Sequence, residues 1–293
     1  LAHLQTELVP DPALTICLWD SASTNTKMPP PPWQIDAYRE GGEVHGFFNE
    51  SIHTVFQLDT NALNILDSSK DIAIYWLATP DQIPSYEMGA PLRTLLHLWM
   101  NRRGIQQVHA GAVGIPTGGV LIAGKGGAGK SNTALACLTS ELFYASDDYC
   151  LLAADPTPTV FSLYSTGKTY ESDISRLPLH ASMISNSDCS DSDKALYFLH
   201  DHFPEKILSS FPLQAILIPR MTGKNDTTLE SASPTVGLTT IAPTTILQFP
   251  RNLSNEAFKT LVKIVRCVRS YYLNLGTDRA QISRVIMDLL LNK

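Results

Sequence analysis

Short apolar runs separated by polar turns make up the first 88 residues of the chain. The runs read TICLW, GEVHGFF, HTVFQL and DIAIYWL, which is the length of β-strands rather than of helices. Four consecutive prolines at 29–32 exclude a helix or a central strand there. The stretch PDQIPSYEMGAP at 80–91 is typical of a linker. We therefore expect a small β-rich N-terminal domain over residues 1–88.

Beyond residue 89, helical spacing and strand-like runs follow each other. LRTLLHLWMNRR predicts a helix that ends before Gly104, and QQVHAGAVGI and GVLIAG predict two strands joined by a turn at 116–119. A helix is expected over about 130–142, and then the strands FYAS, YCLLAA and QAILIP. NEAFKTLVKIVRCVRS and RAQISRVIMDLLL have the spacing of helices, with the strand SYYLNLG between them. Residues 89–293 are therefore expected to form one α/β or α+β domain with a mixed sheet.

Two polar stretches are predicted to be loops. SNSDCSDSDK at 185–194 and MTGKNDTTLESASP at 221–234 show no apolar period. Loops of this length in a compact domain are often lids or binding loops. Simple surface loops explain the composition equally well, and the sequence leaves both interpretations open.

The charge balance and cysteine usage exclude several classes of protein. The net charge is −6, and lysine and arginine form no run longer than a pair, which argues against a nucleic-acid partner. No stretch approaches 18 consecutive apolar residues, and the start LAHLQTELVP lacks the features of a signal peptide, so no membrane association is expected. The five cysteines are scattered without a C-x-x-C pair. Reduced thiols and a cytoplasmic location are the expectation.

The segment GKGGAGKS at 124–131 matches the pattern G-x-x-x-x-G-K-[ST] between an apolar strand and a predicted helix. Glycines let such a loop turn successive backbone N–H groups toward a phosphate, and the helix start adds further donors. The lysine reaches the β- and γ-phosphates, and the serine hydroxyl is a ligand for Mg²⁺. ATP and Mg²⁺ are thus the expected cofactors. The residues expected to bind the nucleotide are Gly124, Gly126, Gly127, Ala128, Gly129, Lys130, Ser131 and Asn132.

Two adjacent aspartates, Asp147 and Asp148, end the short strand that follows the loop and its helix. Neighbouring side chains at a strand end can point in different directions, so that one could hold Mg²⁺ while the other takes a proton. Alone, S-D-D would be a polar turn; beside a phosphate-binding loop it becomes a candidate site. His109, in VHAGAV, is expected on the strand that pairs with the loop's strand. By itself it would be a hydrogen-bonded core residue.

VHAGAV, GKGGAGKS and ASDDY, at these spacings, resemble the HPr kinase/phosphorylase family, and most of all its shorter serine-kinase relatives. The resemblance is specific over about 105–150 and continues through LYSTGK, PLQAILIPR, IAPTTILQFP and YYLNLGTD. It implies a P-loop in a mixed, curved sheet, the fold shared with phosphoenolpyruvate carboxykinase. Some relatives phosphorylate a precursor peptide, notably lasso-peptide precursors at a C-terminal serine.

The resemblance also implies roles for individual residues. Asp147 would be the general base, with His109 hydrogen-bonded to it. Asp148 and Ser131 would hold Mg²⁺, completed by Glu171 or Asp173, of which Glu171 is preferred. Lys130 would contact the phosphates, and Lys168 and Arg220 are candidates for stabilising the transferring phosphoryl group.

The chain departs from the regulatory HPr kinases in two places. It reads YESDISRLP where they carry a glycine-rich signature, and its first 88 residues show no convincing likeness to theirs. Phosphorolysis and HPr as the substrate are therefore in doubt. The leading hypothesis is an ATP- and Mg²⁺-dependent kinase that acts on a serine of a peptide or small protein. A small-molecule hydroxyl kinase and a nucleotide-dependent switch are the alternatives. The oligomeric state stays open, and a homo-oligomer is one option.

Overall fold

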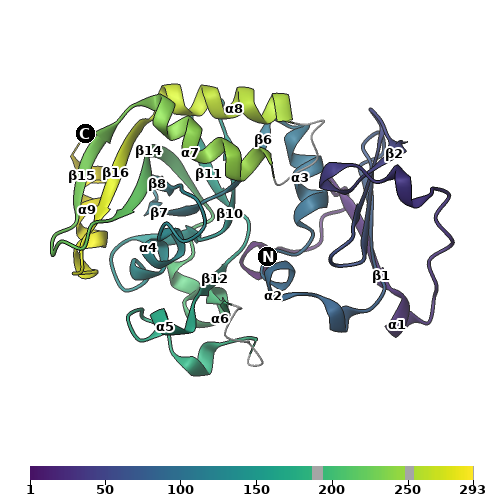
Figure 1. Ribbon diagram of the computed structural model, residues 1–293, viewed down its shortest axis with the longest axis horizontal. Coiled ribbons are helices and arrows are strands. Elements are labelled where there is room, and N and C mark those ends of the chain that lie inside the picture. The colour runs from purple at the N-terminus through teal and green to yellow at the C-terminus, as the bar shows by residue number, and fades with distance from the viewer. Residues whose placement is uncertain (187–193, 248–253, 293) are drawn as a thin grey trace.

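Five short strands of the N-terminal region form one sheet in the computed structural model, which describes residues 1–186, 194–247 and 254–292 (Figure 1). Strand β1 pairs parallel with β5, and the other neighbours pair antiparallel in the order β1-β5-β4-β3-β2. Each of the four apolar runs noted in the sequence contains one strand, and the structure has a fifth strand, β4, in the segment ALNILD. The strands are β1 (Thr15–Asp20), β2 (Glu43–Phe48), β3 (Ile52–Gln57), β4 (Ala62–Asp67) and β5 (Ile72–Leu77), and a short helix α1 (Ser21–Thr24) follows β1.

The segment between this sheet and the rest of the chain is helical. A single turn, α2 (Ser85–Met88), precedes the predicted helix α3 (Arg93–Asn101). Leu95 and Leu98 of α3 pack into the core of the N-terminal sheet. Leu96, on another face of the helix, belongs to a cluster with Tyr149 and Leu151 of the larger lobe. Helix α3 therefore packs on both lobes and stands between them in Figure 1.

Nine strands form the mixed sheet of the larger lobe. The order β6-β10-β11-β14-β8-β7-β9 is extended by β16 beside β14 and by β15 beside β16. The pairs β14–β8 and β14–β16 are parallel, whereas β7–β8 and β6–β10 are antiparallel. The strands are β6 (Ile105–His109), β7 (Gly111–Ile115), β8 (Gly118–Ile122), β9 (Phe143–Ser146), β10 (Tyr149–Ala153), β11 (Thr159–Ser162), β14 (Ser210–Met221), β15 (Thr228–Ala232) and β16 (Arg269–Leu275).

Helices cover both faces of this sheet, and the apolar strand β8 shows why. Its residues are buried on both sides, as expected for a central strand. Val120 and Ile122 face the core under α4 (Lys130–Ala136) and α9 (Ala280–Leu291). Leu121 faces the opposite core, under α7 (Pro234–Ile246) and α8 (Ser254–Cys267), which run along the upper edge of Figure 1. The result is a mixed α/β protein with layers on either side of the sheet.

A smaller two-stranded sheet lies against α4. It consists of β12 (Thr166–Thr169) and β13 (Ala195–Phe198), with the one-turn helices α5 (Glu171–Ile174) and α6 (Leu199–His202) next to them. Gly167 allows a close approach, because a Cβ there would lie 2.8 Å from the Leu135 side chain of α4. This packing brings β12 beside the start of α4. Among the described residues, no helix is long and apolar enough to cross a bilayer.

The structure corrects several sequence expectations. The apolar stretch 106–115 is two strands, separated at Ala110, because β6 pairs with β10 whereas β7 pairs with β8. His109 therefore lies opposite Tyr149 and not on the strand that pairs with the loop's strand. The helix predicted over 130–142 ends at Ala136.

The predicted loop 221–234 contains the strand β15 and the beginning of α7. Ser233 caps this helix by accepting a hydrogen bond from the amide of Val236, and Pro234 occupies its first turn. A serine followed by proline is a known start signal, which the sequence interpretation missed. Most of the other predicted loop, 185–194, lies outside the described residues.

Candidate active site

The glycine-rich loop connects the end of β8 to the start of α4. Gly127 and Gly129 have φ values of +76° and +98°, in the left-handed region that favours glycine. Gly124 permits a close contact, because a Cβ there would lie 2.9 Å from the Cβ of Ala128. The amide of Ala128 donates to the carbonyl of Lys125 at 3.2 Å and closes the turn. The loop thus has the tight curvature that the sequence pattern predicts.

Lys130 is buried inside the loop that precedes it. Its Nζ donates to the carbonyl oxygen of Gly124 at 2.8 Å and to that of Lys125 at 3.3 Å. Burial lowers the pKa of Lys130, and the charge of Asp148 opposes this effect. The ammonium group of Lys130 therefore contacts backbone carbonyls of the loop and lines the cavity in front of it.

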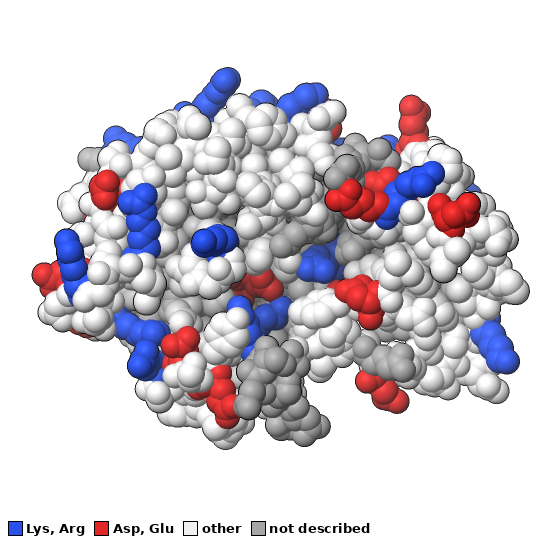
Figure 2. Space-filling view, in the orientation of Figure 1, with Lys and Arg blue, Asp and Glu red and all other residues white. Residues whose placement is uncertain are grey.

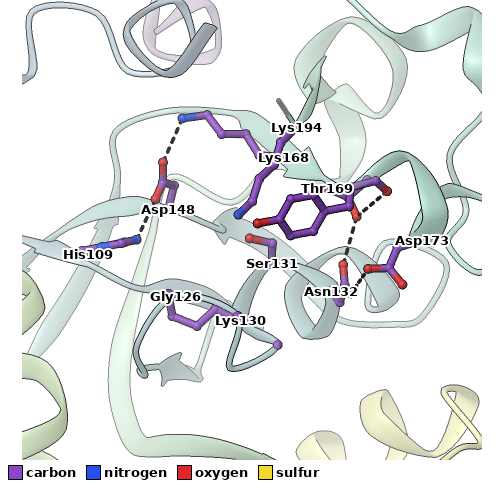
Figure 3. A pocket seen from close by; sticks show the side chains of 13 residues that line it. His109, Gly126, Lys130, Ser131, Asn132, Asp148, Lys168, Thr169, Asp173 and Lys194 are labelled. Atoms are coloured by element: carbon purple, nitrogen blue, oxygen red, sulfur yellow. Dashed lines mark hydrogen bonds and ion pairs between the residues drawn. The ribbon is translucent and has the colours of Figure 1, made fainter. Parts of the chain in front are cut away.

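A cavity of about 170 Å³ opens in front of the loop. Figure 3 shows its side chains, which come from the loop, from α4, from β6, from the turn after β9 and from the small sheet. The residues that line it are His109, Gly126, Gly127, Gly129, Lys130, Ser131, Asn132, Asp148, Lys168, Thr169, Tyr170, Asp173 and Lys194. Most of the predicted site residues therefore meet in one place. Gly124 and Ala128 shape the loop from behind it.

Of the two adjacent aspartates, Asp148 is the one that lines this cavity. Its Oδ1 lies 2.9 Å from Nε2 of His109, and its Oδ2 accepts a hydrogen bond from Nζ of Lys168 at 2.9 Å. Burial alone would raise the pKa of Asp148, but the hydrogen bond from His109 and the charge of Lys168 outweigh it and hold the pKa well below its usual range. Asp148 is therefore ionised at neutral pH.

Asp147 has the opposite environment. It is 1% exposed, and its Oδ2 accepts a hydrogen bond from the amide of Lys168 at 2.8 Å. Its Oδ1 is buried and has no hydrogen-bond partner among the described residues. Burial, and then the charge of Asp148, raise the pKa of Asp147 to about 6. The structure places Nε2 of His109 on Asp148, whereas the sequence resemblance implied a hydrogen bond to Asp147.

We expect Asp147→Asn to raise the stability of the fold at pH 8. With a pKa of about 6, against about 3.9 for an unfolded aspartate, the folded state holds this proton more tightly than the unfolded state does. The resulting stabilisation is complete below about pH 4 and is lost as the pH rises through 6, so that at pH 8 a buried charge weakens the fold.

The asparagine keeps an oxygen for the Lys168 amide and should gain about 1–3 kcal/mol at pH 8, but only about a third as much at pH 4.5. Thermal melts of both proteins at the two pH values measure the difference. An equal gain at both values, or a loss of stability at pH 8, would show that Asp147 is not a costly buried charge.

Asp173 completes the far side of the cavity. Its Oδ2 accepts a hydrogen bond from Nδ2 of Asn132 at 2.9 Å, and its Oδ1 lies 3.5 Å from Nη2 of Arg279. Glu171, the preferred third metal ligand from sequence, is exposed and does not line the cavity. The two acids lie two residues apart on a one-turn helix, and Asp173 is the one that lines the cavity, as Figure 3 shows.

The donor atoms in the cavity fit a magnesium ion that shares its ligands with phosphate. Ser131, Asp148 and Asp173 line it together. Among the described residues, no group of three or more histidine, cysteine, aspartate or glutamate side chains could hold a metal ion. Mg²⁺ is usually held by one or two carboxylates together with substrate phosphates and waters, so a site of this kind does not require a larger cluster of acidic side chains.

Comparison with known proteins gives a likeness in structure alone. No family model and no curated protein sequence matches this chain. The solved structure of the HPr(Ser) kinase/phosphatase from Coxiella burnetii aligns over 64% of this chain and 97% of its own, with 12% identity and a TM-score of 0.36. A likeness at this level carries neither activity nor substrate to this chain.

Arg220 lies outside the cavity. Its guanidinium stacks on the ring of Tyr272 at 3.1 Å and lies 3.9 Å from a carboxylate oxygen of Glu230. Lys168 instead lies in the cavity, with its Nζ on Asp148. Arg220 lies at the end of a buried strand, but its side chain contacts Tyr272 of β16 and Glu230 of β15 rather than the glycine-rich loop.

Sequence reasoning missed several residues that line the cavity. Thr169 donates from Oγ1 to Oδ1 of Asn132 at 3.0 Å, and Tyr170 stands at the rim, 48% exposed. Nζ of Lys194 lies 5.2 Å from the centre of the Tyr170 ring. Thr169 and Tyr170 directly follow Lys168, so proximity to that lysine was the available signal. Lys194, directly before β13, is the last residue of the predicted loop 185–194, for which a binding loop was one of the two interpretations.

Proposed function

We propose that the protein is a kinase that transfers the γ-phosphoryl group of ATP to a serine hydroxyl of a peptide or small protein. One observation supports this above all: a P-loop with a buried lysine and a carboxylate held between a histidine and a lysine share one cavity. The first feature binds a triphosphate, and the second is suited to an attacking hydroxyl. A nucleotide-binding switch would not need the second.

In the proposed reaction Asp148, not Asp147, orients the acceptor. The ionised carboxylate accepts a hydrogen bond from the serine hydroxyl and takes its proton as the oxygen bonds to the γ-phosphorus. The bond from that phosphorus to the β–γ bridging oxygen breaks, and ADP leaves with the electron pair. Because such transition states are loose, a weakly basic carboxylate suffices for this step. His109 and Lys168 keep Asp148 in place.

Positive charge gathers where the phosphoryl group would pass. Lys130, Lys168 and Lys194 all line the cavity. Fixed ammonium groups stabilise charge on a transferring phosphoryl group without reorganisation. A bound Mg²⁺ ion would neutralise further charge on the β- and γ-phosphates, and Ser131 and Asp173 are the residues proposed to hold it.

The rim of the cavity supports a peptide rather than a small metabolite as the acceptor. Tyr170 is half exposed there, and acidic and basic side chains meet in the hollow between the lobes (Figure 2). A serine side chain could therefore enter while the rest of its chain stays outside. A ribosomal precursor peptide of the lasso class, modified at its C-terminal serine, is the acceptor that the sequence resemblance suggests.

We expect serine peptides to gain mass when incubated with the protein, ATP and Mg²⁺. The expected gain is about 80 Da, one phosphoryl group, and the matched alanine peptides should gain nothing. Intact-mass spectrometry measures it. Phosphorylation of free hydroxy metabolites but of no peptide would favour the small-molecule kinase. ATP binding with slow hydrolysis and no acceptor would favour the switch, and either result would overturn the proposal.

A further inference from the structure

Lys168, the lysine that contacts Asp148, is held in place by a segment that does not belong to the P-loop. Lys168 lies on β12, and its side chain is 10% exposed. Its Nζ donates to Oδ2 of Asp148 at 2.9 Å and to the backbone carbonyl oxygen of Tyr86, in α2, at 3.3 Å. The segment that joins the two lobes therefore contacts a group of the candidate site directly.

Gly89, directly after α2, forms the wall of the channel in which Lys168 lies. A Cβ at this position would approach Cε of Lys168 to 2.5 Å and Nζ to 3.1 Å. The backbone here has φ −75° and ψ −17°, which any residue can adopt, so an alanine would not strain the chain but would displace the lysine, with a lesser contact at 3.0 Å from Leu196. Oγ1 of Thr166 donates to the carbonyl of Gly89 at 2.8 Å and fastens this wall to β12.

The same segment is tied to the N-terminal lobe. The hydroxyl of Tyr86 donates to Oδ2 of Asp59, in the turn between β3 and β4. Tyr86 thus contacts the N-terminal sheet through its side chain and Lys168 through its carbonyl. A shift of that turn relative to the larger lobe would be transmitted to the lysine through a single residue.

A second series of contacts connects helix α3 to His109 through Tyr149. Nη1 of Arg93, on α3, donates to the hydroxyl of Tyr149 at 2.6 Å, and Nη2 lies 4.0 Å from the carboxylate of Glu87 in α2. The Tyr149 ring stacks on His109, with 5.1 Å between ring centres and 26° between the planes. Of the two partners of Asp148, Lys168 therefore contacts residues 86–93 directly, and His109 is connected to them through Tyr149.

We propose that Tyr86 and Gly89 are positioning residues that hold Lys168 on Asp148, and that the N-terminal lobe acts on phosphoryl transfer through them. A lysine side chain loses much rotamer freedom when it is fixed, so it stays in one position only where the surroundings enforce it. The part of the proposal that concerns transfer rests on the proposed function. The part that concerns the position of Lys168 does not.

The position of Lys168 can be tested without any reaction. Brief acetylation of the full chain, followed by peptide mass spectrometry, measures how fast the Lys168 amine reacts relative to the exposed Lys125. We expect labelling of Lys168 to be several-fold faster in Gly89→Ala and Tyr86→Phe than in the unmodified protein. Tyr38→Phe is the matched control, since Tyr38 is an N-terminal-lobe tyrosine whose hydroxyl accepts a hydrogen bond from Trp33. Unchanged labelling in both test variants would overturn the positioning role.

A kinetic test follows where transfer is detected. We expect Gly89→Ala to lower kcat about tenfold to a hundredfold and Tyr86→Phe about threefold, with ATP affinity unchanged, because small displacements of a reacting constellation have effects of this size. In a Lys168→Met background neither change should lower kcat further. Additive losses in that background would show a general structural defect and overturn the proposal. If the unmodified protein transfers nothing, the proposed function fails, while the labelling result still decides the position of Lys168.

Discussion

Lys130→Ala is expected to lower phosphoryl transfer by at least about a hundredfold to a thousandfold and to weaken ATP binding. Lys130 is buried in the glycine-rich loop, where its ammonium contacts the carbonyls of Gly124 and Lys125. Within the part of the chain that the structure describes, Lys168 and Lys194 also line the cavity, but Lys130 is the lysine held inside the loop itself. Initial rates with a serine peptide, and ATP binding by calorimetry, measure the two effects.

Lys125→Ala is the matched control for this variant. Lys125 belongs to the same loop and carries the same charge, but its side chain is exposed and does not line the cavity. Its replacement should change the rate by less than about threefold. Equal losses in the two variants would mean that the loop tolerates no change of charge at all, and the specific role of Lys130 would be wrong.

Asp148→Asn is expected to lower transfer by about a hundredfold to ten-thousandfold, the range in which a positioned proton acceptor contributes. The amide can neither take the serine proton nor balance the charge of Lys168, which lies 2.9 Å away. ATP affinity should change little, since Lys130 and the loop backbone stay intact. Rates at saturating ATP, compared with binding measured separately, distinguish the two effects.

Asp147→Asn separates the two neighbouring carboxylates. Asp147 is buried and bonded to the Lys168 amide, so this variant should keep most of the activity while it gains stability at pH 8. The sequence resemblance predicts the reverse order, with Asp147 as the base. A collapse of activity in Asp147→Asn together with a nearly normal rate in Asp148→Asn would restore that assignment.

The glycine-rich loop was predictable because its chemistry is local. Gly127 and Gly129 need left-handed backbone angles, and the lysine and serine directly follow. The apolar run before the loop and the helix-forming residues after it are likewise short-range signals. Strand β8 and helix α4 are found where this pattern puts them.

The choice between the two aspartates could not be read from the sequence. Neighbouring side chains on an extended chain point to opposite sides, and nothing local says which side is the cavity. The difference comes from Lys168, whose backbone amide donates to Asp147 and whose ammonium group donates to Asp148. His109 also contacts Asp148, because β6 pairs with β10. Both relations depend on pairings between distant segments.

The order of the strands has the same origin. Residues 106–115 read QQVHAGAVGI, in which no proline and no cluster of polar turn residues indicates that a strand ends at Ala110. The break exists because β6 and β7 pair with different neighbours. For Glu171 and Asp173, the hydrogen bond from Asn132 and the contact with Arg279 select the second acid, and neither is visible before folding.

Transfer of radioactive label to a serine peptide tests the central claim most directly. The full chain is incubated with Mg²⁺, the peptide and ATP labelled either in the γ- or in the α-phosphate, and the peptide's amino acids are then separated. The proposed reaction predicts label on phosphoserine from γ-labelled ATP, none from α-labelled ATP, and none in the Lys130→Ala variant. Label from the α-position, label on another residue type, or no label on any serine peptide would contradict it.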